Sequence, residues 1–391
     1  MDRKAMAALS SGHLATDLAQ GSLPALLPYL KDEFGLSYTL AAALVLAATI
    51  ASSVIQPAFG LWSDARGALW LLPAGVALAG VGMGAAALAP SYWVVVVCVL
   101  AAGVGVAAYH PEGSKFANYV SGSARASGMS FFSVGGNVGF ALGPILASAF
   151  IVSFGLNGGA LLAVPGLIVA GALLFVLPYL AGFAPSEERR AQAPVQRAER
   201  RGITLLLVVV GLRSVAHMGL FTFIPLWEKS QGHSAAYGTR VLSAFLIAGA
   251  VGTLVGGRLA DHFGRRPVLR WSFVVSVPLI LVYVLVGGPI GIVAIVLAGA
   301  AVIGTFGVSL VMSQEYMPGR VGMASGLSIG LAIGLGGVAA VTLGAVADAV
   351  DLRAAVLATA TGPALALGVS MFLPPAPLRR RMEPEPAPAT L

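Results

Sequence analysis

Imidazole, carboxylate and guanidinium groups interrupt several of the long apolar stretches in this 391-residue sequence. A charged side chain at the centre of a bilayer costs about 2.5–3.5 kcal/mol, so such groups persist there when they are paired, face water or take part in chemistry. Histidines and partly buried carboxylates exchange protons near neutral pH. The embedded groups therefore predict a proton-handling or ion-pairing site; they are His13, Asp17, His110, Glu112, Arg213, His217 and Glu315.

The first of these groups lies in the apolar segment that begins near residue 7. His13 and Asp17 are four residues apart, which places them on one face of a helix, and Gln20 lies within one further turn. Asp17 is about midway along the segment, too deep for its carboxylate to reach the membrane interface easily. We expect a carboxylate that faces a cavity, with a structural polar contact between helices as the alternative.

A second group follows an uncharged apolar stretch in "AAYHPEGSKFAN". Pro111 lacks an amide hydrogen and frees a carbonyl one turn earlier, so it is expected to kink or break the helix. Irregular backbone at membrane depth is tolerated where protein or water satisfies it. We expect His110 and Glu112 to face the cavity there and to exchange protons. In the alternative, Glu112 anchors a cytoplasmic gate through Lys115 or Arg125.

Arg213 lies near mid-depth in a later apolar segment, and His217 follows one helical turn further on. A guanidinium at this depth would bind an anionic substrate through paired hydrogen bonds, or pair with the carboxylate of Asp17. A purely structural ion pair is the alternative for Arg213. His217 is assigned to the same cavity.

The composition indicates a membrane protein. The chain is 58% hydrophobic and 10% charged, and its mean hydropathy is +0.89, whereas a soluble domain carries roughly 25% charged residues. The net charge of +7 does not indicate a nucleic-acid partner, because the basic residues form short clusters between apolar runs. The single cysteine, Cys98, excludes an internal disulfide and a cysteine-based metal site. No metal and no cofactor are expected.

A membrane helix needs about 20 mostly apolar residues, and the sequence contains about twelve such runs in two sets of six. The first run shows no signal-peptide cleavage site and is expected to remain as a membrane helix. The predicted units are an N-terminal bundle (1–181), a polar basic linker (182–201), a C-terminal bundle (202–375) and a disordered tail (376–391). The predicted spans are 7–30, 38–62, 69–89, 92–116, 125–153, 158–181, 202–227, 235–260, 266–287, 289–316, 320–347 and 352–374.

Lysine and arginine placement predicts the orientation. Loops on the side of the N-terminus carry most of the basic residues, including the arginines of the linker and of the tail, whereas the other side receives Lys31, Lys229, Arg240 and Arg353. Basic loops remain in the cytoplasm. Both termini and the linker are therefore expected to be cytoplasmic.

The two halves repeat. "GLWSDARG" and "GRLADHFGRR" each follow the second span of their set, and Gly60 to Asp64 has the same spacing as Gly257 to Asp261, with an offset of 197 residues. At that offset Arg213 falls on position 16, almost the symmetry mate of Asp17. Two like halves with a substrate site at their interface are a common transporter construction.

The loops at the cytoplasmic ends of the helices predict a gate. Glu315 precedes "MPGR" and is expected to contact Arg320 or Arg265, and the two aspartates of the repeated loops are expected to pair with nearby arginines and latch the bundles. The predicted gate and loop residues are Gly60, Asp64, Arg66, Gly257, Asp261, Gly264, Arg265, Arg266, Glu315 and Arg320.

A glycine-rich run, "SVGGNVGFALGP", lies inside the fifth predicted span. It is not a nucleotide-binding loop, because no strand precedes it. Its glycines are expected to permit close helix packing, and Asn137 is expected to face the cavity.

These motifs resemble those of a known family. "GRLADHFGRR" resembles the G-x-x-x-D-x-x-G-R-[RK] loop of the major facilitator superfamily, and the N-terminal copy departs from it at Ala68, where the arginine belongs. "GFALGP" resembles an element of the superfamily's proton-coupled antiporters. Within the superfamily the chain resembles the fosmidomycin-resistance efflux family, through "SGHLATD", "QPAFGLWSD", "HPEGSKFA", "FSVGGNVGFALGP", "QEYMPGRVGMASGL" and "LGAVAD".

The resemblance implies an all-α fold of twelve transmembrane helices in two pseudo-symmetric bundles, with helices one, four and seven lining a central cavity. It also implies alternating access and export of a small molecule driven by proton entry across a bacterial inner membrane. The expected partners are protons, a small anionic or drug-like substrate and the lipid bilayer, and the protein is expected to be a monomer.

Two other functions compete with proton-coupled export. Proton-symport uptake of a small metabolite is compatible with the same fold, and "GFALGP" favours antiport over it. An intramembrane enzyme is the third hypothesis. The sequence contains no H-E-x-x-H, G-x-S-x-G or Walker motif, so an enzyme is not expected.

Overall fold

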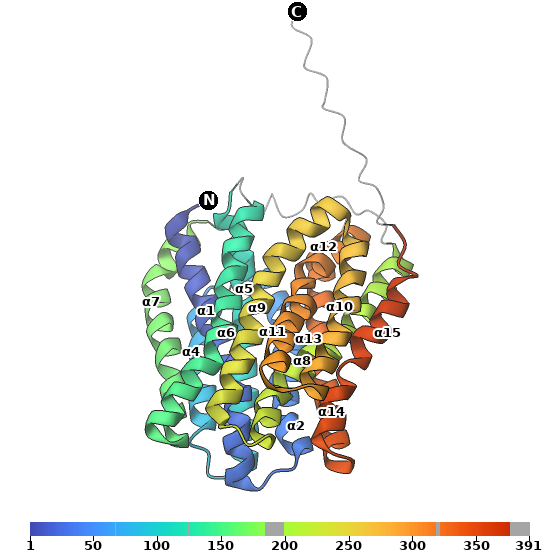
Figure 1. Ribbon diagram of the computed structural model, residues 1–391. Coiled ribbons are helices and arrows are strands. Elements are labelled where there is room, and N and C mark those ends of the chain that lie inside the picture. The colour runs from blue at the N-terminus through green and yellow to red at the C-terminus, as the bar shows by residue number, and fades with distance from the viewer. Residues whose placement is uncertain (67, 123–124, 184–198, 318–320, 376–391) are drawn as a thin grey trace, which may run out of the picture.

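The computed structural model describes residues 1–66, 68–122, 125–183, 199–317 and 321–375, and over these residues the chain is helical without strands (Figure 1). Ten of its helices are long and apolar enough to cross a membrane, and the helix Leu71–Ala86 is a shorter apolar one. The helical segments follow the twelve predicted spans. They are α1 (Arg3–Phe34), α2 (Tyr38–Val54), α3 (Gln56–Arg66), α4 (Leu71–Ala86), α5 (Tyr92–Val120), α6 (Arg125–Phe154), η1 (Leu156–Leu162), α7 (Ala163–Ala181), α8 (Arg200–Ser230), α9 (Ala235–Phe263), α10 (Arg265–Leu285), α11 (Gly288–Gly304), α12 (Phe306–Tyr316), α13 (Val321–Ala349), α14 (Leu352–Ala358) and α15 (Thr361–Ser370).

The elements form two groups side by side. In Figure 1, α1, α4 and α7 lie on the left of the bundle, and α10, α14 and α15 lie on the right. The two groups meet along α2 and α13 and along α6 and α9. The start of α1 and the end of α15 lie at the same end of the bundle, which we call the terminal end. An even number of crossings requires this arrangement.

Helix α5 continues through Pro111 and ends at Val120. Of the predicted kink or break at Pro111, the break is therefore absent, and His110 and Glu112 both lie within α5. Proline is tolerated inside membrane helices when neighbouring groups satisfy the freed backbone, and α1, α6, α8 and α10 also contain internal prolines. The tenth predicted span is divided at Thr305, which separates α11 from α12.

Helix α6 packs against α1 through a row of glycines. Gly135, Gly139 and Gly143 are four residues apart, and a Cβ atom on any of them would collide with backbone atoms of α1. Glycine at helix contacts lets two backbones approach closely in a membrane. The predicted role of the glycine-rich run is thus visible in the packing, and this close contact sets the rotation of α1 about its own axis.

The two halves are joined at the end opposite the termini. The carboxylate of Asp348 on α13 accepts hydrogen bonds from the backbone N–H groups of Tyr38 and Thr39 at 2.8 and 2.9 Å, and from the Thr39 hydroxyl at 2.6 Å. These are the first residues of α2, so a carboxylate from one half caps a helix of the other. Lys229 of α8 also pairs with Asp32 of α1. Between the described residues, the hydrogen bonds and ion pairs that join the halves lie at this end.

Candidate functional site

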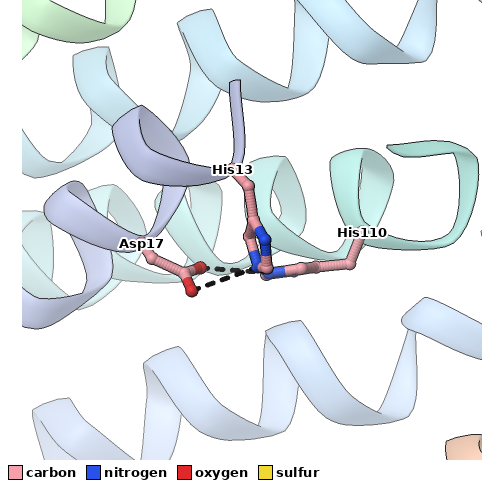
Figure 2. Close-up of side chains that lie close together, drawn as sticks. All are labelled: His13, Asp17 and His110. Atoms are coloured by element: carbon pink, nitrogen blue, oxygen red, sulfur yellow. Dashed lines mark ion pairs between the residues drawn. The ribbon is translucent and has the colours of Figure 1, made fainter. Parts of the chain in front are cut away.

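Three polar side chains from α1 and α5 converge in the N-terminal half (Figure 2). His13 Nε2 lies 3.3 Å from Asp17 Oδ2, and His110 Nε2 lies 3.0 Å from Asp17 Oδ1. All three side chains are mostly buried, with the Asp17 side chain 15% exposed. We call this group the His–Asp–His cluster. It unites His13, Asp17 and His110, which the sequence had placed in two separate segments.

The hydrogen bonds of the two imidazoles define how the rings present their nitrogens. His13 Nδ1 lies 2.8 Å from the carbonyl oxygen of Phe132, and His110 Nδ1 lies 3.0 Å from that of Val106. A carbonyl oxygen only accepts hydrogen bonds, so Nδ1 carries the hydrogen in both rings. In a neutral histidine of this tautomer, Nε2 presents a lone pair. Both Nε2 lone pairs therefore point at the carboxylate of Asp17.

Aromatic and glycine neighbours hold the cluster in place. The His13 ring stacks on Phe132 of α6, with centroids 4.2 Å apart, and lies edge-on to the His110 ring at 5.0 Å. Tyr109 is fully buried beside them, and its hydroxyl donates to the Leu9 carbonyl, which ties α5 to α1. These contacts fix the distance between the two helices that supply the cluster.

Gly136 of α6 also lies against the cluster, although the sequence did not single out this residue. A Cβ at this position would lie 2.5 Å from His13 Nε2 and 2.6 Å from Asp17 Oδ2. The run "SVGGNVGFALGP" indicated close packing, but the second of its adjacent glycines faces the cluster and not the α1 backbone. Adjacent glycines, which must point to different sides of a helix, were the available signal.

Three other predicted cavity residues lie outside the cluster. Glu112 is fully buried, and its Oε2 lies 2.8 Å from Lys115 Nζ on the same helix, so both its expected proton exchange and its alternative gate role stay predictions. Gln20 is half-buried on α1, and Asn137 is exposed on α6. On a regular helix, Glu112 points about 200° away from His110, so the two side chains do not share a face.

Arg213 occupies a second polar site, in the C-terminal half. Its side chain is 2% exposed, and Nη1 lies 3.2 Å from Ser309 Oγ and 3.5 Å from Thr305 Oγ1. The guanidinium also lies over the Phe306 ring, 4.9 Å from its centroid, and the half-buried His217 lies edge-on to the same ring. Among the described residues, no carboxylate lies within ion-pair distance of Arg213.

The predicted direct pairing of Asp17 with Arg213 is therefore wrong. Asp17 contacts two histidines on its own side, and Arg213 contacts hydroxyls of α11–α12 inside the C-terminal half. The offset of 197 residues equates Arg213 with Thr16, which is buried inside the N-terminal half. One position on a helix turns a side chain by about 100°, so Arg213 faces the interior of its bundle and not Asp17.

The repeated loop is best described in the C-terminal half. Gly264 joins α9 to α10 with φ 89° and ψ 152°, a conformation that side-chain-bearing residues rarely adopt. Arg265 Nη1 lies 2.5 Å from Glu315 Oε1, one of the two predicted contacts of Glu315. This pair joins α10 to α12 within one half and does not bridge the halves. Arg266 donates to the Leu373 carbonyl at 3.1 Å.

The other predicted loop residues differ in their exposure, and some lie outside the described part of the chain. Gly60 on α3 and Gly257 on α9 are half-buried, and Asp261 on α9 is exposed. The side chains of Asp64 and Arg66, and the whole of Arg320, lie outside the described part of the chain. The predicted latch between the two loops therefore stays a prediction.

Comparison with known proteins identifies the fold family. The family model for the Major Facilitator Superfamily matches residues 9–341 and 237–389. The chain is 31% identical over 382 residues to the "Uncharacterized MFS-type transporter YfnC" of Bacillus subtilis (strain 168), covering 94% of this chain and 92% of that protein. It is 30% identical over 375 residues to the "Fosmidomycin resistance protein" of Escherichia coli (strain K12), with the same coverage.

A solved structure shares the arrangement of helices. The bacterial homologue of the human lysosomal transporter Spinster, in an inward-facing and occupied conformation, superposes with a TM-score of 0.78 at 16% identity, covering 97% of this chain and 98% of that one. At this identity the likeness concerns the fold alone. The match to the family model and the relatives at 30% and 31% identity assign the protein to its family. The chain belongs to the Major Facilitator Superfamily, and it is a membrane transporter and not an enzyme.

Proposed function

We propose that this transporter exports a small anionic or drug-like molecule across a bacterial inner membrane in exchange for protons. The observation that carries the proposal is the convergence of two histidine Nε2 atoms on the carboxylate of Asp17. Charged and titratable groups inside membrane proteins mark proton relays and substrate pathways. The proposal names protons as the coupling ion and the His–Asp–His cluster as the place where they bind.

The hydrogen bonds around the cluster support the proposal that it binds protons. With Nδ1 hydrogens engaged by carbonyls, each Nε2–carboxylate contact sets one lone pair against another and is repulsive. A proton between the nitrogen and the oxygen turns the contact into a charge-assisted hydrogen bond. The cluster accepts two such protons, and its net charge then changes from −1 through 0 to +1. The proton between His110 and Asp17 stabilises the contact between α5 and α1, whereas the proton between His13 and Asp17 stabilises a contact within α1.

Contacts at the end opposite the termini support a state that is closed on the external side. Between the described residues, the hydrogen bonds and ion pairs that join the halves lie at this end, around Asp348 and the Lys229–Asp32 pair. Basic residues are concentrated at the terminal end, which the positive-inside rule assigns to the cytoplasm. With this orientation the external side is closed, and both termini are cytoplasmic.

The export direction and the substrate class rest on two supports. The relative from Escherichia coli is named for resistance to fosmidomycin, and resistance by a membrane carrier is achieved by efflux. Arg213 is a buried guanidinium with hydroxyl and aromatic neighbours and no carboxylate partner within the described residues. An anionic group on the substrate supplies the opposite charge that this site lacks.

Proteoliposomes test the coupling directly. An acidic interior should drive uptake of labelled fosmidomycin into the vesicles, because protons leave as the substrate enters, and a protonophore should abolish the uptake. Accumulation driven by an acidic exterior would replace export with proton symport. Transport that is unchanged after both the pH gradient and the membrane potential are collapsed would refute proton coupling.

A pair of carboxylate variants on one helix localises the coupling site. Asp17→Asn should abolish accumulation driven by the proton gradient. Exchange of labelled for unlabelled substrate, measured in the absence of a gradient, should remain detectable. Glu33→Gln, which alters an exposed carboxylate at the end of the same helix, is the matched control and should transport normally. Full pH-driven accumulation by the Asp17 variant would remove the cluster from the coupling mechanism.

A further inference from the structure

The same three side chains have the geometry of a metal site. His13 Nε2, His110 Nε2 and an oxygen of Asp17 lie within 4.8 Å of one another. His13 Nε2 lies 3.3 Å from Asp17 Oδ2, and His110 Nε2 lies 3.0 Å from the other oxygen, Oδ1. A tetrahedral zinc ion with bonds of about 2.0–2.2 Å holds its ligand atoms about 3.3–3.6 Å apart. Each imidazole nitrogen is therefore within a few tenths of an ångström of this spacing from one of the two carboxylate oxygens (Figure 2).

The orientation of the rings is a second, independent observation. Metal-ligating histidines donate their other ring N–H to a backbone carbonyl or carboxylate, which fixes the tautomer and aims the free nitrogen at the metal. Both histidines here make that bond, to the carbonyls of Phe132 and Val106. A neutral histidine of this tautomer has no hydrogen on the facing nitrogen, so the contact with the carboxylate becomes favourable when an added proton or a metal ion lies between the two atoms.

The surroundings of the Asp17 carboxylate also favour a metal site. Asp17 Oδ1 is buried, and with His110 in its neutral tautomer it has no hydrogen-bond donor, although His110 Nε2 lies 3.0 Å away. A buried carboxylate oxygen without a donor is costly, and it is satisfied when a cation lies between it and the imidazole. Tyr109 is not a further ligand, because its hydroxyl donates to the Leu9 carbonyl.

We propose that His13, Asp17 and His110 form a binding site for a divalent transition-metal ion, in the first place Zn²⁺, with a fourth coordination position open. Two imidazoles and one carboxylate suit zinc, nickel and copper and do not suit magnesium or calcium, which prefer oxygen ligands. The ion occupies the lone pairs that the coupling protons would use. Zinc should therefore inhibit transport, a consequence that rests on the proposed function, whereas metal binding itself does not.

The test is direct binding of Zn²⁺ to the purified, chelator-treated full chain in detergent, without a polyhistidine tag. Calorimetry should show one ion per chain at neutral pH. His110→Ala should weaken the affinity by more than the roughly 10–100-fold that loss of an outer-shell partner costs. The double variant His233→Ala/His262→Ala removes the two histidines at the helix ends and should bind as the wild type does. Absence of stoichiometric binding, or equal affinity in the His110 variant, would overturn the proposal.

A spectroscopic measurement on the wild type covers the case in which a cluster variant does not fold. Co²⁺ in a four-coordinate site with nitrogen and oxygen ligands gives intense visible absorption, and titration with Zn²⁺ should remove it at one equivalent. A weak octahedral spectrum would contradict the site. Transport assays in the presence of a chelator test the proposed function independently of metal binding. Proton-driven transport without metal would uphold the proposed function whether or not zinc binds.

Discussion

Gly136 offers the sharpest test of the site, because a single methyl group there would collide with two members of the cluster. In Gly136→Ala the new Cβ would lie 2.5 Å from His13 Nε2 and 2.6 Å from Asp17 Oδ2. Ordinary Cβ contacts begin at 3.4 Å, so both side chains must move by almost an ångström. Such a movement separates the imidazole from the carboxylate or breaks the stacking of His13 on Phe132.

The magnitude follows from two opposing effects. Adding a methyl group to a packed interior costs about 1–3 kcal/mol, whereas alanine favours a helix over glycine by about 0.5–1 kcal/mol. Gly171 on α7 has no atom within 4 Å of the position of a Cβ. Gly171→Ala should therefore change the free energy of unfolding only through the helix preference of alanine. The difference between the two variants isolates the collision, and it should be about 1–3 kcal/mol.

Thermal unfolding in detergent and transport in proteoliposomes measure this difference. Gly136→Ala should unfold at a lower temperature than Gly171→Ala. Its proton-driven transport should fall by about tenfold for each 1.4 kcal/mol by which the collision destabilises the transport-active conformation. Gly171→Ala should transport as the wild type does. The reasoning is refuted if Gly136→Ala matches Gly171→Ala in both stability and transport.

Three further changes test other parts of the structure. Asp348→Ala removes a cap of α2, worth about 0.5–2 kcal/mol, and should shift the population about 2- to 30-fold towards a state open at that end; unchanged distances between spin labels on α2 and α13 would contradict a role of Asp348 in closing that end. Arg213→Gln should weaken binding of an anionic substrate and leave the melting temperature unchanged or raised, because no buried partner loses its counter-charge; a large loss of stability would reveal a carboxylate partner. Gly264→Ala forces a side chain into a glycine conformation and should lower stability by about 1–3 kcal/mol, which a wild-type melting curve would disprove.

Much of the fold could be predicted from the sequence because membrane solvation acts locally. Runs of about 20 apolar residues must become helices in a bilayer, and the helices follow the twelve predicted spans. The i, i+4 spacing of His13 and Asp17 was likewise sufficient for their contact, since both lie on one turn of one helix.

Contacts between helices were predicted less well, because they depend on how each helix is rotated about its axis. The sequence singled out His110 but paired it with Glu112, whereas its partner is Asp17 on another helix. Arg213 was placed opposite Asp17, although a difference of one position turns it into its own bundle. The proline at 111 suggested a break that neighbouring helices make unnecessary.

The sequence by itself determined that this protein is a bundle of membrane helices with a few buried titratable groups, because composition and short-range spacing settle those features. Only the tertiary structure decided which of these groups meet. The bond between Asp348 and Tyr38 joins residues 310 positions apart, and the contact between His110 and Asp17 joins α5 to α1. Such contacts arise from the packing of whole helices, which no local pattern of residues encodes.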